Sequence, residues 1–316
     1  MRAAILRSLA SSALLTLLLV PAVSDAQGPG IAQQARDTVA SKKRDLSLDP
    51  GRAVAIDTDE GSWISVDISP DGNTLVLDML GDLYTLPISG GNATPLALGM
   101  AMDVQPRFSP DGKSVVFVSD RDGGDNVWVM DLATHKAKQI THGKMNNYRS
   151  PDWTPDGKYI VVSKGDFGLG PQKLWLYHKD GGQGVQLIKE TPQPPIPPTS
   201  IVGAAVSPNG RYVWYSQRIG PWNYNSQLPQ YQLYALDRQS GRKDLKTGRY
   251  GSAFRPTLSP DGKWLVYGTR QESQTGLRIR DLETDDEKWL AYPVQRDEQE
   301  SLAPMDVLPG MSFTPD

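Results

Sequence analysis

The stretch that decides the fold is Phe108-Ser109-Pro110-Asp111-Gly112-Lys113. Proline presets φ for the first corner of a turn, aspartate caps its own backbone, and glycine accepts positive φ, so Pro-Asp-Gly predicts a tight turn. Residues 104–108 before it and 114–118 after it are rich in β-forming side chains. The stretch therefore predicts two neighbouring antiparallel strands joined by this turn.

The same turn recurs along the chain. The other complete copies are Ser69-Pro70-Asp71-Gly72, Thr154-Pro155-Asp156-Gly157, Ser207-Pro208-Asn209-Gly210 and Ser259-Pro260-Asp261-Gly262. A further copy begins at Thr314-Pro315-Asp316, and successive prolines are 40, 45, 53, 52 and 55 residues apart. A β-sandwich also has many short strands, but it would not repeat one turn in register five times.

Each repeat also contains a third run of β-forming residues and a short fourth one. The third runs are residues 83–86, 127–130, 174–177, 233–236 and 277–280. Four short strands in each unit of this length are typical of a β-propeller blade. We therefore expect an all-β propeller with five complete blades and the start of a further one at residues 311–313, so that the chain stops inside a blade. Residues 52–57 are expected to form an outer strand that needs a later strand, which leaves an open array with a bare edge.

The N-terminus has the pattern of a secretory signal. Arg2 and Arg7 precede an apolar stretch centred on residues 15–20, and Ser24-Asp25-Ala26 offers a cleavage site. We expect a signal peptide over residues 1–26, a linker over 27–50 and the propeller over 51–316. The expected location is periplasmic or secreted, with no membrane span after cleavage.

Composition excludes several functions. The 316 residues carry a net charge of −3, which argues against a nucleic-acid partner because phosphate binding needs a basic surface. The chain has no cysteine, so disulfides, thiolate nucleophiles and thiolate metal sites are excluded.

The repeat resembles a known type. Residues 108–113 and 258–263 resemble the TolB-type propeller repeat, in which an apolar residue precedes Ser-Pro-Asp-Gly-Lys and a strand follows. Residues 59–72, 81–87 and 119–128 are similar to the N-terminal propeller of secreted bacterial amidohydrolase-family proteins. In that family a metal-dependent hydrolase domain follows the propeller.

The resemblance implies an exported accessory domain of a hydrolase that acts on carbon-nitrogen bonds other than peptide bonds. It places the divalent metal in a hydrolase domain absent from this chain, and the expected partner is that C-terminal catalytic domain or another protein. The alternative is a stand-alone periplasmic TolB-like propeller that binds proteins.

The chain offers no catalytic constellation in its sequence. The metal-binding His-x-His pair of the amidohydrolase family is absent, and the three histidines, His135, His142 and His178, are dispersed. Serine hydrolases with a propeller carry Gly-x-Ser-x-Gly at the nucleophile, and that pattern is absent too. We therefore predict no catalytic, cofactor-binding or metal-binding residue in this chain.

A contact face is predicted from the irregular loops. Loops between second and third strands share one face with the blade-to-blade connections, because consecutive strands alternate in direction. The acidic loop at residues 120–126 could hold calcium, but it lacks the terminal glutamate of an EF-hand, and turn formation explains its residues. The possible contact residues are Trp222, Tyr224, Asp120, Asp122 and Asp125. The opposite face, with the Pro-Asp-Gly turns, is expected to be plain, its aspartates serving as turn caps.

Overall fold

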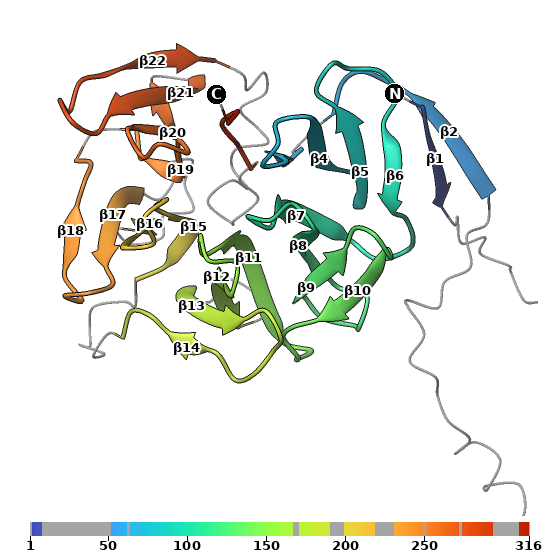
Figure 1. The fold of residues 1–316 in the computed structure, drawn as a ribbon, viewed down its shortest axis with the longest axis horizontal. Helices are drawn as coiled ribbons and strands as arrows, with labels where there is room; N and C mark the ends of the chain where they lie inside the picture. The colour runs from blue at the N-terminus through green and yellow to red at the C-terminus, as the bar shows by residue number, and fades with distance from the viewer. Residues whose placement is uncertain are drawn as a thin grey trace, which may run out of the picture.

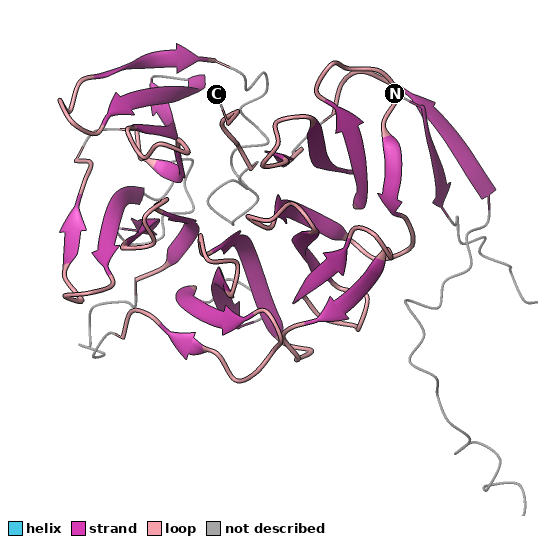
Figure 2. Cartoon of the chain, in the orientation of Figure 1, coloured by secondary structure: helices cyan, strands magenta, loops and turns pink. Residues whose placement is uncertain are grey.

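Five four-stranded antiparallel sheets surround a common axis (Figure 1). The computed structural model describes residues 2–7, 52–61, 64–166, 171–189, 199–218, 231–248, 251–271, 274–292 and 310–315. These residues form strands and loops and no helix (Figure 2). Accordingly, no membrane-spanning helix is found among them. The prediction of an all-β propeller with five blades is confirmed.

The strands of each blade follow one another in chain order from the axis outward. Blades 1 and 2 consist of β3 (Val66–Ile68), β4 (Thr74–Met79), β5 (Asp82–Pro87), β6 (Thr94–Ala97), β7 (Asp103–Phe108), β8 (Ser114–Ser119), β9 (Asn126–Asp131) and β10 (Lys136–Gln139). Blade 3 consists of β11 (Asn146–Trp153), β12 (Tyr159–Asp166), β13 (Lys173–His178) and β14 (Val185–Gln186). Blades 4 and 5 consist of β15 (Ile201–Val206), β16 (Tyr212–Arg218), β17 (Tyr231–Asp237), β18 (Lys243–Leu245), β19 (Phe254–Leu258), β20 (Trp264–Gln271), β21 (Gln274–Asp281) and β22 (Glu287–Ala291).

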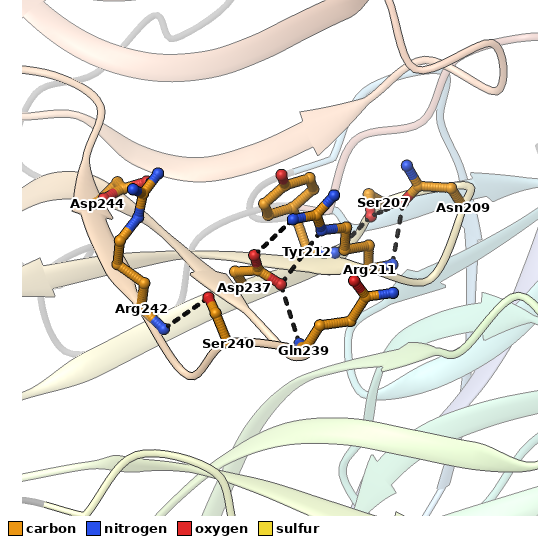
Figure 3. A network of polar contacts seen from close by, with 9 residues as sticks. All are labelled: Ser207, Asn209, Arg211, Tyr212, Asp237, Gln239, Ser240, Arg242 and Asp244. Carbon is orange, nitrogen blue, oxygen red and sulfur yellow. Dashed lines mark hydrogen bonds and ion pairs between the residues drawn. The ribbon is translucent and has the colours of Figure 1, made fainter.

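The repeated motif joins the first and second strands of each blade by side-chain bonds. The Ser109 hydroxyl donates to Asp111 Oδ1 at 2.6 Å and accepts the backbone N–H of Ser114 at 3.0 Å. Blade 4 makes the same bonds with Asn209 in place of the aspartate (Figure 3). These bonds lower the pKa of the motif aspartates, with the motif hydroxyl as the largest cause. The expected role of the aspartates as turn caps is confirmed.

The apolar core lies between neighbouring blades. Val118 and Val127 of blade 2 pack with Tyr148 and Ile160 of blade 3 in one buried cluster. A similar cluster joins each of the other consecutive pairs from blade 1 to blade 5. Burial of such residues stabilises the structure by about 1.5–3 kcal/mol for each side chain. Each blade therefore shares its core with its neighbours.

The innermost strands carry a bulge at an equivalent position, four residues before the motif Ser or Thr. The register shifts there in β7, β11, β15 and β19. The bulged residues have positive φ, namely Gln105 (57°), Ser150 (54°), Gly203 (67°) and Arg255 (55°). Three of the four are not glycine, so these positions hold a conformation that costs about 1–3 kcal/mol and must be stabilised by their surroundings.

The bulge directs backbone N–H groups to the preceding blade. Gln105 N–H donates to Asp78 Oδ2 at 2.6 Å, Ser150 N–H to Gln105 Oε1 at 2.6 Å, and Arg255 N–H to Ser216 Oγ at 3.0 Å. In each bond the acceptor belongs to the blade before the donor. We call these bonds the axial junctions, and they link blade 1 to 2, blade 2 to 3, and blade 4 to 5.

Residues 310–315 lie between blade 5 and blade 1 (Figure 1). Gly310 stands four residues before the last motif copy, as the bulged residues do before theirs. Its carbonyl accepts Val66 N–H at 3.2 Å, and its N–H donates to Ser65 Oγ at 2.9 Å. Pro315 approaches Gly72 as Pro70 approaches Gly112, so this segment repeats the contact made between blades 1 and 2.

Two expectations about the ends need correction. Residues 311–313 were expected to form a strand, but residues 310–315 join no β-ladder and touch blade 1 through the contacts of Gly310 and Pro315. The edge of blade 1 is therefore partly covered rather than bare. Residues 52–57 do form a strand, β2 (Arg52–Asp57), and it pairs with β1 (Arg2–Arg7) in a separate two-stranded sheet. The rest of the predicted signal peptide and the linker lie outside the described residues.

Replacing Thr154 by Val tests the motif bonds. The change keeps the shape of the buried side chain but removes the hydroxyl that donates to Asp156 at 2.6 Å and accepts Tyr159 N–H at 3.0 Å. We expect the free energy of unfolding to fall by about 1–2 kcal/mol, because a buried N–H and a carboxylate lose their partner. Urea denaturation measures it, with Thr94→Val on the surface as the control. Equal stability of the two variants would contradict the assigned role of the hydroxyl.

Replacing Gly310 by Val tests whether residues 310–315 pack against blade 1. A Cβ at this position would lie 3.1 Å from Ser65 Cβ and 3.3 Å from Arg255 Nη2. We expect a loss of stability of about 1–3 kcal/mol, because overpacking displaces the segment from blade 1. Thermal melting measures it. Gly99→Val is the control, since a Cβ there has no neighbour within 4 Å. A melting temperature equal to that of the control would show that the segment does not pack there.

Candidate functional site

A pocket of about 300 Å³ lies at the axis, on the face with the Pro-Asp-Gly turns. We call it the axial pocket. The residues that line it include one at the same position in each repeat, two residues before the motif Ser or Thr: Asp67, Arg107, Asp152, Ala205, Thr257 and Ser312. Motif prolines, among them Pro70 and Pro260, line it as well. The face that was expected to be plain therefore contains a pocket with charged walls.

Arg107 and Asp67 form one side of this pocket. Arg107 Nη1 lies 3.2 Å from Asp67 Oδ1 and donates to the carbonyl oxygen of Met311 at 2.7 Å. The other oxygen of Asp67 accepts Phe108 N–H at 2.7 Å. Both carboxylate oxygens are therefore used, and the pair links blade 1, blade 2 and the segment 310–315.

Buried charges adjoin the Arg107–Asp67 pair. Arg255 is buried, and its Nη1 donates to Ser150 Oγ. Burial lowers the pKa of Arg255 to about 9, so the guanidinium stays charged at neutral pH. Asp78 accepts N–H bonds from Ser65 at 2.7 Å and Gln105 at 2.6 Å. Burial raises the pKa of Asp78 to about 6, against the opposing effect of these bonds and of Arg255.

Asp152 is the second carboxylate of the axial pocket. Its Oδ2 accepts Val206 N–H at 2.9 Å, which links blade 3 to blade 4. Burial raises the pKa of Asp152, the Asp67 charge acts in the same direction, and Arg107 opposes them. Within the described part of the chain, Asp152 forms no ion pair at 4 Å or less, in contrast to Asp67.

The predicted acidic loop lies away from the axial pocket, between β8 and β9. Asp120 accepts Met102 N–H at 2.8 Å, Asp122 accepts the Gln139 amide at 3.1 Å, and Asp125 pairs with Arg149 at 2.7 Å. The structure thus gives each aspartate a partner in its own neighbourhood. Trp222 and Tyr224 lie outside the described residues. The predicted contact face stays a prediction.

Sequence reasoning missed the residues of the axial pocket. A signal was present, since aligning the repeats on their turns places the charged residues Asp67, Arg107 and Asp152 at one position. Chemically, the charged groups hold backbone and side chains of neighbouring blades and frame a space that can take a ligand. Among the described residues, no group of three or more His, Asp or Glu is arranged to hold a metal ion.

Comparison with known proteins agrees with this architecture. The family model of the tricorn protease N-terminal β-propeller domain matches residues 64–222, half of the chain. The chain belongs to this propeller family. The structure described as the putative TolB from Agrobacterium tumefaciens has a TM-score of 0.60 with 17% identity, covering 75% of this chain and 83% of that one. At this identity the likeness supports a TolB-like fold.

Two similar proteins match this chain over very different shares of their own length. The uncharacterized peptidase YuxL of Bacillus subtilis is 26% identical over 178 residues, which are 56% of this chain and 23% of the peptidase. The uncharacterized protein Atu1656 of Agrobacterium fabrum is 25% identical over 235 residues, which are 70% of this chain and 72% of that protein. The chain thus spans less than a quarter of the first relative and most of the second.

The buried carboxyl of Asp78 predicts a pH dependence of stability. Its pKa of about 6 exceeds the unfolded value of about 3.9, so the folded protein holds the proton more tightly. Stability from this group therefore rises as the pH falls from 7 to 5, by about 1 kcal/mol. Urea denaturation at both pH values measures it in the wild type and in Asp78→Asn. The difference between the two proteins should shift by this amount, and parallel pH profiles would contradict the assignment.

Proposed function

We propose that this chain is the ligand-binding propeller of a larger exported hydrolase that acts on carbon-nitrogen bonds other than peptide bonds. The observation that carries the binding role is the axial pocket. Its charged residues Asp67, Arg107 and Asp152 form bonds that join neighbouring blades, so they offer a rigid recognition surface. Recognition sites benefit from side chains that are held in place before the ligand arrives.

The hydrolase context rests on three lines of support. The matching family is named for the N-terminal propeller of a protease. The similar Bacillus protein is a peptidase of which this chain spans 23%. Residues 59–72, 81–87 and 119–128 resemble the propeller of amidohydrolase-family proteins. This resemblance favours substrates with carbon-nitrogen bonds other than peptide bonds over peptide substrates. In this proposal the catalytic domain and its divalent metal lie outside this chain, and residues 1–26 direct the protein to the periplasm or beyond.

A second candidate is a stand-alone TolB-like propeller that binds another protein in the periplasm. It is favoured by the alignment with the Agrobacterium protein, which extends over 70% of this chain and 72% of that protein. Both candidates assign recognition, and not catalysis, to this chain.

The test is an activity assay on the protein produced from its whole reading frame and on residues 27–316 alone. We expect the whole protein to hydrolyse non-peptide amides, with 4-nitroacetanilide and N-acetyl amino acids as probes. A divalent-metal chelator should abolish the activity and added zinc should restore it, while residues 27–316 turn over neither probe. Hydrolysis of peptide anilides that diisopropyl fluorophosphate blocks would contradict the amidohydrolase assignment. Absence of any amide hydrolysis by the whole protein would favour the stand-alone propeller.

A further inference from the structure

We propose that the axial pocket binds a primary ammonium group, with Asp152 as its carboxylate partner and Thr257 as a second acceptor. The ammonium belongs to the N-terminus of a peptide or to a lysine side chain. This inference rests on the proposed binding role of the pocket and names the ligand chemistry.

In this proposal the ammonium lies on the side of blades 3 to 5. On the side of blades 1 and 2, Arg107 and Asp67 are already paired with each other. At the same position blade 4 has only the methyl group of Ala205, between Asp152 of blade 3 and Thr257 of blade 5. The small residue therefore leaves room between a carboxylate and a hydroxyl.

The charges of this pocket favour a cation. Two carboxylates, Asp67 and Asp152, line it together with one guanidinium, Arg107. Behind the lining, the buried Arg255 guanidinium interacts with Asp152, Asp78 and Asp67, so three carboxylates stand against two guanidinium groups in this region. Arg107 Nη1 is already bonded to Asp67 and to the carbonyl of Met311, and Asp152 keeps no ion-pair partner among the described residues. A carboxylate that is partly withdrawn from water, as Asp152 is, is stable when it is paired or protonated. An arriving ammonium would supply the missing partner, whereas an anion would be repelled by Asp152.

The hydroxyl of Thr257 gives an independent indication that the pocket binds a ligand. Its side chain is only 8% exposed, and among the described residues its Oγ1 has no hydrogen-bond partner. A buried hydroxyl without a partner costs about 1–3 kcal/mol, so a ligand that bonds to it regains this energy. An ammonium group carries three donors. Asp152 can accept one of them, and Thr257 can accept another once its side chain rotates and turns the shielded Oγ1 toward the pocket.

The remaining walls suit the carbon chain behind such a group. Pro208, Pro256, Leu258 and Pro260 line the pocket near the free space, on blades 4 and 5. These apolar side chains have no charge to satisfy and offer contact to methylene or methyl groups. The pocket thus combines a charged end for the ammonium with apolar walls for its stem.

Calorimetric titration of the full chain with three peptides tests this inference. The probes are tetra-alanine amide with a free N-terminus, its N-acetylated form, and N-acetyl-Ala-Ala-Lys-Ala amide. We expect at least one ammonium-bearing probe to bind at least tenfold more tightly than the acetylated tetra-alanine. Preference for the first identifies an N-terminus as the ligand, and preference for the third identifies a lysine side chain.

Two variants and a control locate the site. Asp152→Asn should weaken binding of the preferred probe at least tenfold by removing the charge. Ala205→Leu should do the same by filling the space, and it leaves Asp152 and its bond to Val206 in place. The control is Asp180→Asn, whose side chain is 65% exposed and lies outside the pocket. Circular dichroism confirms folding of each variant.

Equal binding of acetylated and free probes, absence of binding at millimolar concentration, or unchanged affinity in folded Ala205→Leu would overturn the inference. These outcomes leave the amide hydrolysis assay unaffected, so failure of the ligand assignment and failure of the proposed function can be told apart.

Discussion

The interaction on which the rest depends is the axial junction, the bond from a bulged N–H in one innermost strand to a side chain of the preceding blade. The backbone N–H of Gln105 donates to Asp78, and its side-chain oxygen accepts Ser150 N–H, so one residue connects three blades. Such bonds contribute about 0.5–1.5 kcal/mol with a neutral acceptor and about 1.5–3 kcal/mol with a charged one. They offset the cost of positive φ at non-glycine residues and fix the width of the space at the axis.

Two carboxylates, each two residues before a motif Ser or Thr, add further bonds between blades on the face with the Pro-Asp-Gly turns. Asp67 and Asp152 each accept the N–H of the next blade, at Phe108 and Val206. The same residues that hold blades together therefore line the pocket. Blade 4 has Ala205 at this position, which has no side-chain acceptor for this bond and borders the space that the ligand proposal uses.

The blades could be predicted from the sequence because their signals are local. The Pro-Asp-Gly turns and the flanking β-forming runs act within about ten residues, and the structure contains each expected turn. The axial pocket could not be predicted, because its contacts join residues about 40 or more positions apart, such as Asp67 and Arg107, or Ser150 and Arg255. Loop irregularity drew attention to Asp120, Asp122 and Asp125 instead, and the structure shows these side chains bonded to nearby groups.

The central claim is that the axial junctions, together with the bond from Val206 N–H to Asp152 between blades 3 and 4, make the five blades one cooperative unit. Native-state hydrogen exchange tests it most directly, through the amides of Gln105, Ser150 and Arg255. The account predicts that all three exchange only through global unfolding, with a common free energy and a common dependence on denaturant. Exchange of these amides through separate local openings, at different free energies in blades 2, 3 and 5, would contradict it.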